Sequence, residues 1–242
     1  MLLRLVILFF VMIPGWAWAN RVSSVKVSGG SEAGPASFFQ GSGRLGINDY
    51  LQLRANAGNY HNRFAENLLS YRLGANFRWP NGNYFQTYFS FQDLTPISSR
   101  QSIDPSARFN LTKSLALLTA ARLAKVESPT SSADQIEATL GLDWYMLPTW
   151  LVYVEFSASQ FHDPNGLAYD LSLAKSSLNA GLGWEPKDFL SFFLDYYQNR
   201  TLDGFSTQIA TLGADYDVNR DFSLGMSANN LPGLNARLTY FW

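Results

Sequence analysis

Apolar and polar residues alternate with a period of two along most of the chain beyond residue 20. The clearest segment runs from Leu69 to Trp79, where apolar residues fill the odd positions and Ser, Arg, Gly and Asn fill the even ones. A turn signal, Pro-Asn-Gly at 80–82, follows it, and the alternation resumes from Phe85 to Gln92. This pattern predicts antiparallel β-strands with one apolar face and one polar face.

Similar segments recur down the chain, and the connections between them differ in length. Short turns are predicted at 48–49, 80–82, 113–114, 147–149, 186–188 and 218–220. Longer polar connections are predicted near 29–36, 60–66, 95–104, 127–133, 162–172 and 201–205, with a short exception at 231–232. Alternation of short and long connections is typical of a transmembrane antiparallel up-and-down β-barrel, an all-β fold, here of about 14 strands. A count of about 12 is the alternative, because the segments at 22–28 and 105–112 are the least regular.

Aromatic residues gather beside the predicted short turns, at positions that share the outward face. Amphipathic rings belong at that depth of a membrane barrel, where they form an interfacial girdle. The alternative is the core of a soluble β-sandwich, which would need a second apolar layer, whereas the other face of nearly every strand is polar. The girdle residues are Trp79, Phe85, Trp144, Trp150, Trp184, Tyr216, Phe222 and Trp242.

Residues 1–19 have the features of a signal peptide that directs export. Arg4 supplies a positive charge, Leu5 to Ile13 form an apolar run, and Ala-Trp-Ala at 17–19 matches the small-x-small cleavage pattern. The alternative is a membrane anchor, but the apolar run is shorter than the ~20 residues that span a bilayer. We therefore predict a signal peptide at 1–19 and a single barrel domain at 20–242.

Composition excludes several classes of function. The chain has 18 Lys+Arg against 19 Asp+Glu, a net charge of -1, which gives no electrostatic basis for nucleic acid binding. Cysteine is absent, and the only histidines are His61 and His162. We therefore expect no metal centre, and no motif predicts a cofactor.

The last nine residues, Leu-Asn-Ala-Arg-Leu-Thr-Tyr-Phe-Trp, resemble the C-terminal assembly signal of Gram-negative outer-membrane β-barrel proteins. Most such signals end in Phe, whereas this chain ends in Trp. The resemblance implies a location in the outer membrane, insertion by the barrel assembly machinery, and contact with membrane lipid and lipopolysaccharide. The residues that carry it are Leu234, Ala236, Leu238, Tyr240 and Trp242.

Charged residues predicted to face the lumen separate by sign along the chain. Arg72 falls on the fourth predicted strand and Asp195 on the eleventh, about half a circumference apart in a barrel of about 14 strands. The predicted basic wall is Arg44, Arg54, Arg72, Arg78, Arg108 and Arg122. The predicted acidic wall is Glu137, Asp143, Glu155, Glu185, Asp195 and Asp215, with Lys175 and Arg237 as exceptions.

Opposed charged walls across a wet lumen favour a porin-like channel for small hydrophilic solutes, with sugars or oligosaccharides as candidates because tyrosines accompany both signs. The alternative is a non-conducting barrel with a structural or polysaccharide-export accessory role. In that case the charges would pair across a narrow lumen, with Tyr88, Tyr145 and Tyr153 filling the gaps. A third class, an enzyme at the outer rim, would need a histidine with a serine or aspartate partner. His162 and Asp163 are neighbours in a predicted loop and make a poor dyad, so we expect no enzymatic activity.

Overall fold

The computed structural model describes residues 23–32, 36–61, 67–95, 98–129, 132–162, 174–201, 204–230 and 233–241. The predicted signal peptide, the end of the chain at Trp242 and most of the longer connections lie outside these ranges. The strands are β1 Ser24–Glu32, β2 Ala36–Gly46, β3 Leu51–His61, β4 Asn67–Arg78, β5 Tyr84–Thr95, β6 Ser98–Asn110, β7 Leu115–Glu127, β8 Ser132–Leu147, β9 Trp150–His162, β10 Ala174–Lys187, β11 Leu190–Thr201, β12 Ser206–Asp217, β13 Phe222–Asn229 and β14 Gly233–Phe241.

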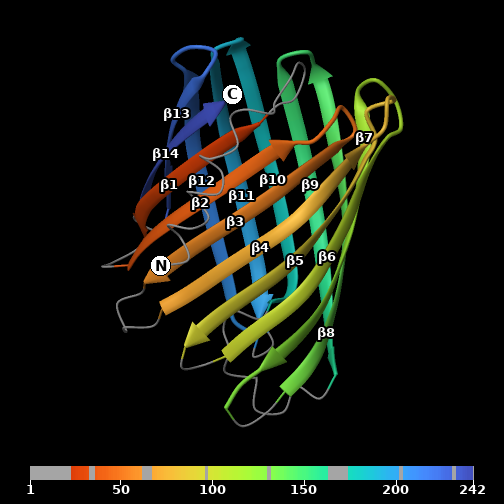
Figure 1. Cartoon of the computed structure of the whole chain (residues 1–242), viewed down its shortest axis with the longest axis vertical. Helices are drawn as coiled ribbons and strands as arrows, with labels where there is room; N and C mark the ends of the chain where they lie inside the picture. The colour runs from red at the N-terminus through yellow and green to blue at the C-terminus, as the bar shows by residue number, and fades with distance from the viewer. Residues whose placement is uncertain are drawn as a thin grey trace.

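These strands form one closed barrel in chain order (Figure 1). Every strand pairs antiparallel with its neighbours in sequence, and β1 closes the sheet by pairing with β14, with Ser24 opposite Phe241. The prediction of an up-and-down barrel is confirmed, with 14 strands rather than 12. Within the ranges described, no helix is long and apolar enough to cross a membrane.

The short turns lie at the upper end of Figure 1, and the opposite ends of the strands lie at the lower end. Side chains close several of these turns. Asn48 Oδ1 accepts hydrogen bonds from the backbone N–H groups of Tyr50 and Leu51, at 2.9 and 2.8 Å. In the turn after β4, Gly82 has a φ of 81°, which glycine adopts without strain. Asn48 and Gly82, which lie in short turns predicted from the sequence, therefore stabilise those turns in the ways typical of asparagine and glycine.

The predicted connection at 95–104 is wrong, because β6 begins at Ser98. Arg100 and Asp104 are thus strand residues, and the polar composition that suggested a loop belongs to a strand whose inward face is polar. Pro105 lies within β6 and lacks an N–H. The pairing of β6 with β7 is accordingly interrupted without a change of register: Ile103 lies opposite Leu123 and Ser106 opposite Ala120, but Asp104 and Pro105 have no registered partner in β7.

The outward face of the barrel is apolar. Large apolar side chains such as Leu73, Phe89 and Met226 are 63%, 55% and 67% exposed, as expected for residues that face lipid. Two predicted girdle residues stack on each other, since the ring centroids of Trp150 and Trp184 are 5.5 Å apart, and Phe192, which was not predicted, extends the stack at 5.6 Å from Trp184. The alternate residues of each strand face the lumen.

Candidate functional site: the charged lumen

The strands place eleven of the twelve predicted lumen charges on the face opposite the exposed apolar side chains. The exception is Glu185, which lies in a register irregularity between Trp184 and Lys187 and is exposed at the end of β10. Arg78 is the last residue of β4 and is also exposed. The inward charges are nevertheless not equivalent, because their partners differ.

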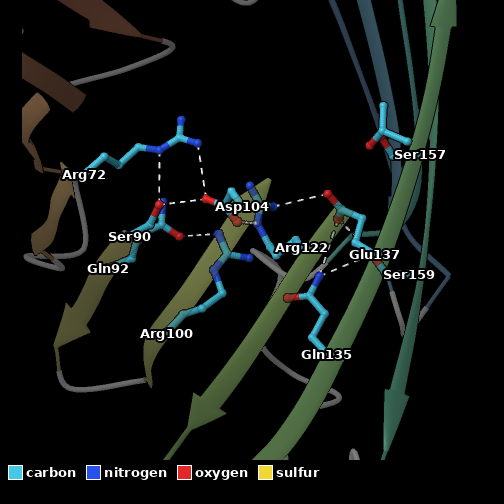
Figure 2. Close-up of polar contacts among 11 residues, drawn as sticks. Arg72, Ser90, Gln92, Arg100, Asp104, Arg122, Gln135, Glu137, Ser157 and Ser159 are labelled. Carbon is cyan, nitrogen blue, oxygen red and sulfur yellow. Dashed lines mark hydrogen bonds and ion pairs between the residues drawn. The ribbon is translucent and has the colours of Figure 1, made fainter. Parts of the chain in front are cut away.

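One group of charges forms a hydrogen-bonded network along the wall from β4 to β8 (Figure 2). Arg72 donates from Nη2 to Asp104 Oδ2 at 3.2 Å and from Nε to Ser90 Oγ at 3.2 Å. Asp104 also accepts from Ser90 at 2.7 Å and from Arg122 Nε at 2.8 Å. Arg122 Nη1 reaches Glu137 Oε1 at 3.3 Å. We call these five residues the seam network.

The seam network extends toward β9 through uncharged partners. Ser159 Oγ donates to Glu137 Oε2 at 2.8 Å, and Gln135 Nε2 donates to Ser159 Oγ at 3.2 Å. Beside the network, Arg100 on β6 donates to Gln92 on β5 (Figure 2). The side chains of Asp104 and Glu137 are only 9% and 16% exposed. The acids of the network are therefore largely shielded from water, and each has a cation and a hydroxyl as partners.

Two further pairs lie on the wall. Arg108 Nε donates to Asp143 Oδ2 at 2.9 Å, and the ring of Tyr145 lies under the Arg108 guanidinium. Arg237, an exception to the predicted acidic wall, donates from Nε to Asp215 Oδ1 at 2.7 Å. These pairs, like those of the seam network, join strands that are adjacent or two apart. Within the described ranges, the charges pair along the wall and not across the lumen.

Four further cations, which lie on β1 to β4, form a basic arc. Lys175, the other predicted exception, lies in the register irregularity at the start of β10. Among the described residues, no ion pair involves Lys26, Arg44, Arg54 or Arg78. Arg44 and Arg54 lie directly opposite each other on β2 and β3. Arg54 donates only to neutral oxygens, those of Gln86 at 3.4 Å and Tyr88 at 3.3 Å.

The remaining mid-strand carboxylates, Glu155 on β9 and Asp195 on β11, form an acidic arc. Neither makes an ion pair with any described residue, and Asp195 accepts a hydrogen bond from Tyr153. In the closed barrel β2 and β9 are seven strands apart, as are β4 and β11. The basic and acidic arcs therefore face each other across the lumen, separated on one side by the neutralised seam network.

Glycines let long side chains lie flat against this wall. A Cβ on Gly181 would stand 2.5 Å from the ring of Tyr153, which crosses it to reach Asp195. A Cβ on Gly225 would meet the Asp215–Arg237 pair in the same way. Glycine at such positions permits the close approach of a neighbouring side chain.

Sequence reasoning missed several inward charges, among them Lys26, Arg100 and Asp104. Asp104 was assigned to a loop, although its spacing of two from Ser102 and six from Ser98 places it on the inward face of β6. Lys26 lay in the weak first segment and now stands on the inward face of β1, two residues from Ser24, which pairs with Arg44. The presence of Asp104 changes the predicted basic wall, because Arg72 and Arg122 share this carboxylate.

The histidines end strands at the rim. His61 is the last residue of β3 and His162 the last of β9, where it lies opposite Asp134. Asp163 lies outside the described residues. Ser157 is hydrogen-bonded to Thr139 at 2.7 Å and Ser159 to Glu137, so neither serine is paired with His162 in this geometry. The expectation that the chain is not an enzyme stays a prediction.

The residues of the predicted assembly signal alternate as the resemblance requires. Leu234, Leu238 and Tyr240 on β14 are 64%, 44% and 42% exposed on the outward face, and Ala236 is exposed between them. Trp242 lies outside the described residues.

No protein-family model and no curated protein matches the chain. Several solved structures match its fold. One described as a bacterial polysaccharide outer membrane secretin has a TM-score of 0.55 at 8% identity, over 93% of this chain and 100% of that one. The KdgM porin has a TM-score of 0.53 at 8% identity, over 90% and 98%. A mutant of the TodX monoaromatic hydrocarbon channel has a TM-score of 0.53 at 9% identity, over 93% and 90%. The chain has the fold of outer-membrane β-barrel channels.

Proposed function

We propose that the chain is an outer-membrane channel through which small hydrophilic solutes pass between the basic arc and the acidic arc. The single observation that carries this proposal is the placement of the unpaired charges on opposite walls. Fixed charges of opposite sign across water set up a transverse field, which orients polar solutes and disfavours apolar ones. The fold supports the proposal, since it is shared with a porin and with a hydrocarbon channel.

The dimensions of the barrel also support an open lumen. Strands about 4.8 Å apart and tilted by about 40° give a 14-stranded barrel a circular diameter of about 28 Å. An arginine and an aspartate side chain together reach about 10 Å from their backbones, which is too short to pair across that width. The observed pairing along the wall is consistent with this geometry.

Planar-bilayer recording tests the proposal. We expect stable single-channel conductance, and a reversal potential in a KCl gradient that responds to the arcs. Arg44→Gln with Arg54→Gln should shift selectivity severalfold toward cations, and Glu155→Gln with Asp195→Asn should shift it toward anions. Lys125→Gln is the matched control, because Lys125 is 59% exposed and paired with Glu127 on the outward face. Absence of any opening, at every voltage, would overturn the proposal.

The second candidate is a non-conducting barrel with a structural or polysaccharide-export accessory role. Two observations favour it. The inward-facing Val126 and Ala133 are 0% and 3% exposed, because they pack with Phe161 near the long-connection end. In addition, the fold is shared with the polysaccharide secretin. It predicts silence in liposome-swelling assays and a crosslinked partner. A rim enzyme would instead lose a lipid or peptide cleavage activity in His162→Ala.

We further propose that the barrel assembly machinery inserts the chain by reading β14, and that the outward face contacts lipid and lipopolysaccharide. The alternating exposed residues Leu234, Leu238 and Tyr240 support the first part. Tyr240→Ala combined with deletion of Trp242 should lower the folded, heat-modifiable fraction in outer membranes. An unchanged fraction would contradict a role of this strand in assembly.

A further inference from the structure

A cavity of about 270 Å³ lies on the lumen side of β2, β3 and β4, at their long-connection ends. Its apolar lining comes from Phe38, Tyr60 and Leu68, which lie side by side because the register places Phe38 opposite Tyr60 and Tyr60 opposite Leu68. All three side chains are only partly buried. These aromatic and aliphatic side chains are thus exposed to water in the lumen, at the long-connection end of the barrel.

The next inward row lines the same cavity with polar groups. Gln40 lies opposite Gly58, and Gly58 lies opposite Ser70. A Cβ on Gly58 would stand 3.2 Å from Ser70 Oγ and 3.6 Å from Gln40 Cγ, so glycine keeps the floor open between the amide and the hydroxyl. The cavity therefore has a ring-bearing side and a hydrogen-bonding side.

The cavity lies on the same inward face of β2 and β3 as part of the basic arc. Phe38, Gln40 and Arg44 share the inward face of β2, and alternate residues on one face are about 6.7 Å apart. A solute held between Phe38 and Gln40 therefore lies about 17 Å along the strand from Arg44. The cavity and the unpaired cations therefore lie on the same inward-facing surface of the strands, with the cavity nearer the long-connection end.

We propose that this cavity is a binding subsite for one ring of a carbohydrate. A pyranose has an apolar C–H face that can pack on Phe38 and Tyr60, and hydroxyl groups around its edge that can bond to Gln40 and Ser70. An aromatic hydrocarbon would cover the same rings but leave the amide and hydroxyl desolvated without partners. Sites for whole drug-sized ligands run from about 300 to 1,000 Å³, so a space of this size suits a single ring.

This subsite rests on the proposed function, because it would be a binding site for solutes that enter the channel. It names their class as carbohydrates. Binding and conduction are nevertheless separate measurements, so the two ideas can fail independently.

Calorimetric titration of the folded protein in detergent with maltotriose and with cellotriose tests the subsite. We expect saturable binding of at least one trisaccharide, about tenfold weaker in Phe38→Ala and severalfold weaker in Gln40→Ala. Phe89→Ala is the matched control, since it also removes a phenyl ring but from the outward face, where Phe89 is 55% exposed. It should bind like the parent protein.

Three results would overturn the subsite: no saturable binding of either sugar, full affinity in Phe38→Ala, or displacement of the bound sugar by benzyl alcohol at equal concentration. Conductance measured on the same preparations separates this failure from failure of the channel. A conducting protein without sugar binding refutes the subsite alone, whereas sugar binding that needs Phe38 in a protein that never conducts refutes the channel alone.

Discussion

Replacing Arg122 with methionine removes the cation at the centre of the seam network while keeping a long apolar side chain. Arg122 bonds Asp104 at 2.8 Å and Glu137 at 3.3 Å, and its side chain is 27% exposed. Removing one partner of a fully buried ion pair costs about 3–5 kcal/mol, and of an exposed pair about 0–1 kcal/mol. Asp104 would keep Arg72 and Ser90, whereas Glu137 would keep only uncharged partners. We therefore expect Arg122→Met to lower the free energy of unfolding by about 2 kcal/mol.

The assay is urea unfolding of the barrel in lipid vesicles, followed by the fluorescence of the girdle tryptophans. Arg78→Met is the control, because Arg78 is an exposed cation without an ion pair among the described residues, and it should cost at most about 0.5 kcal/mol. Glu137→Gln should cost less in the Arg122→Met protein than in the parent, with a coupling of about 1 kcal/mol. Equal losses in Arg122→Met and Arg78→Met, or strict additivity of the double variant, would refute the shielded network.

Two other perturbations probe the wall and the topology. Gly181→Ala should destabilise the barrel by about 1–3 kcal/mol in the same unfolding assay, because its Cβ would stand 2.5 Å from the ring of Tyr153. Gly41→Ala should not, since a Cβ there meets nothing within 4 Å, and equal effects would count against the packing argument. On intact cells an impermeant maleimide should label Pro129→Cys but not Lys113→Cys, both at exposed turn positions of a chain without cysteine. We expect this because outer-membrane barrels place short turns in the periplasm and longer loops outside the cell, and the reverse result would contradict that orientation.

The strands and their faces could be predicted from the sequence because a period of two is a local property. The alternation from Leu69 to Trp79 shows which residues share a face of the strand without any knowledge of the neighbouring strands. Pro-Asn-Gly marks where the strand ends. The count of 14 followed from the number of such segments. The same reasoning failed for β6, where Pro105 and a run of polar residues looked like a loop. A strand whose outward face includes Ser99 and Gln101 gives a weak alternating signal.

The pairing of the charges could not be predicted from parity alone. The alternation along each strand predicts that Arg122 and Glu137 face the lumen. Their contact, however, follows from the register that places them directly opposite each other on β7 and β8. Arg72 meets Asp104 across an intervening strand, which requires both the register and the length of the arginine side chain. Two uniform walls were therefore the natural reading of the sequence. The structure divides them into paired charges and arcs.

This division leads to a test with two double variants, each of which removes one positive and one negative charge and so leaves the net charge of the protein unchanged. Arg122→Met with Glu137→Gln deletes a pair whose charges are 3.3 Å apart, whereas Arg54→Gln with Asp195→Asn deletes charges on opposite sides of the lumen. A dipole is charge times separation, so the first deletion changes the transverse field little and the second changes it strongly. The first variant should lose stability and retain the parent's permeability to a zwitterion such as glycine in liposome swelling. The second should keep its stability, because neither charge has an ionic partner to lose, and should admit glycine at a different rate relative to neutral glycerol. If both variants change permeation equally, the field arises from all inward charges together, and the separation into seam network and arcs has no functional meaning.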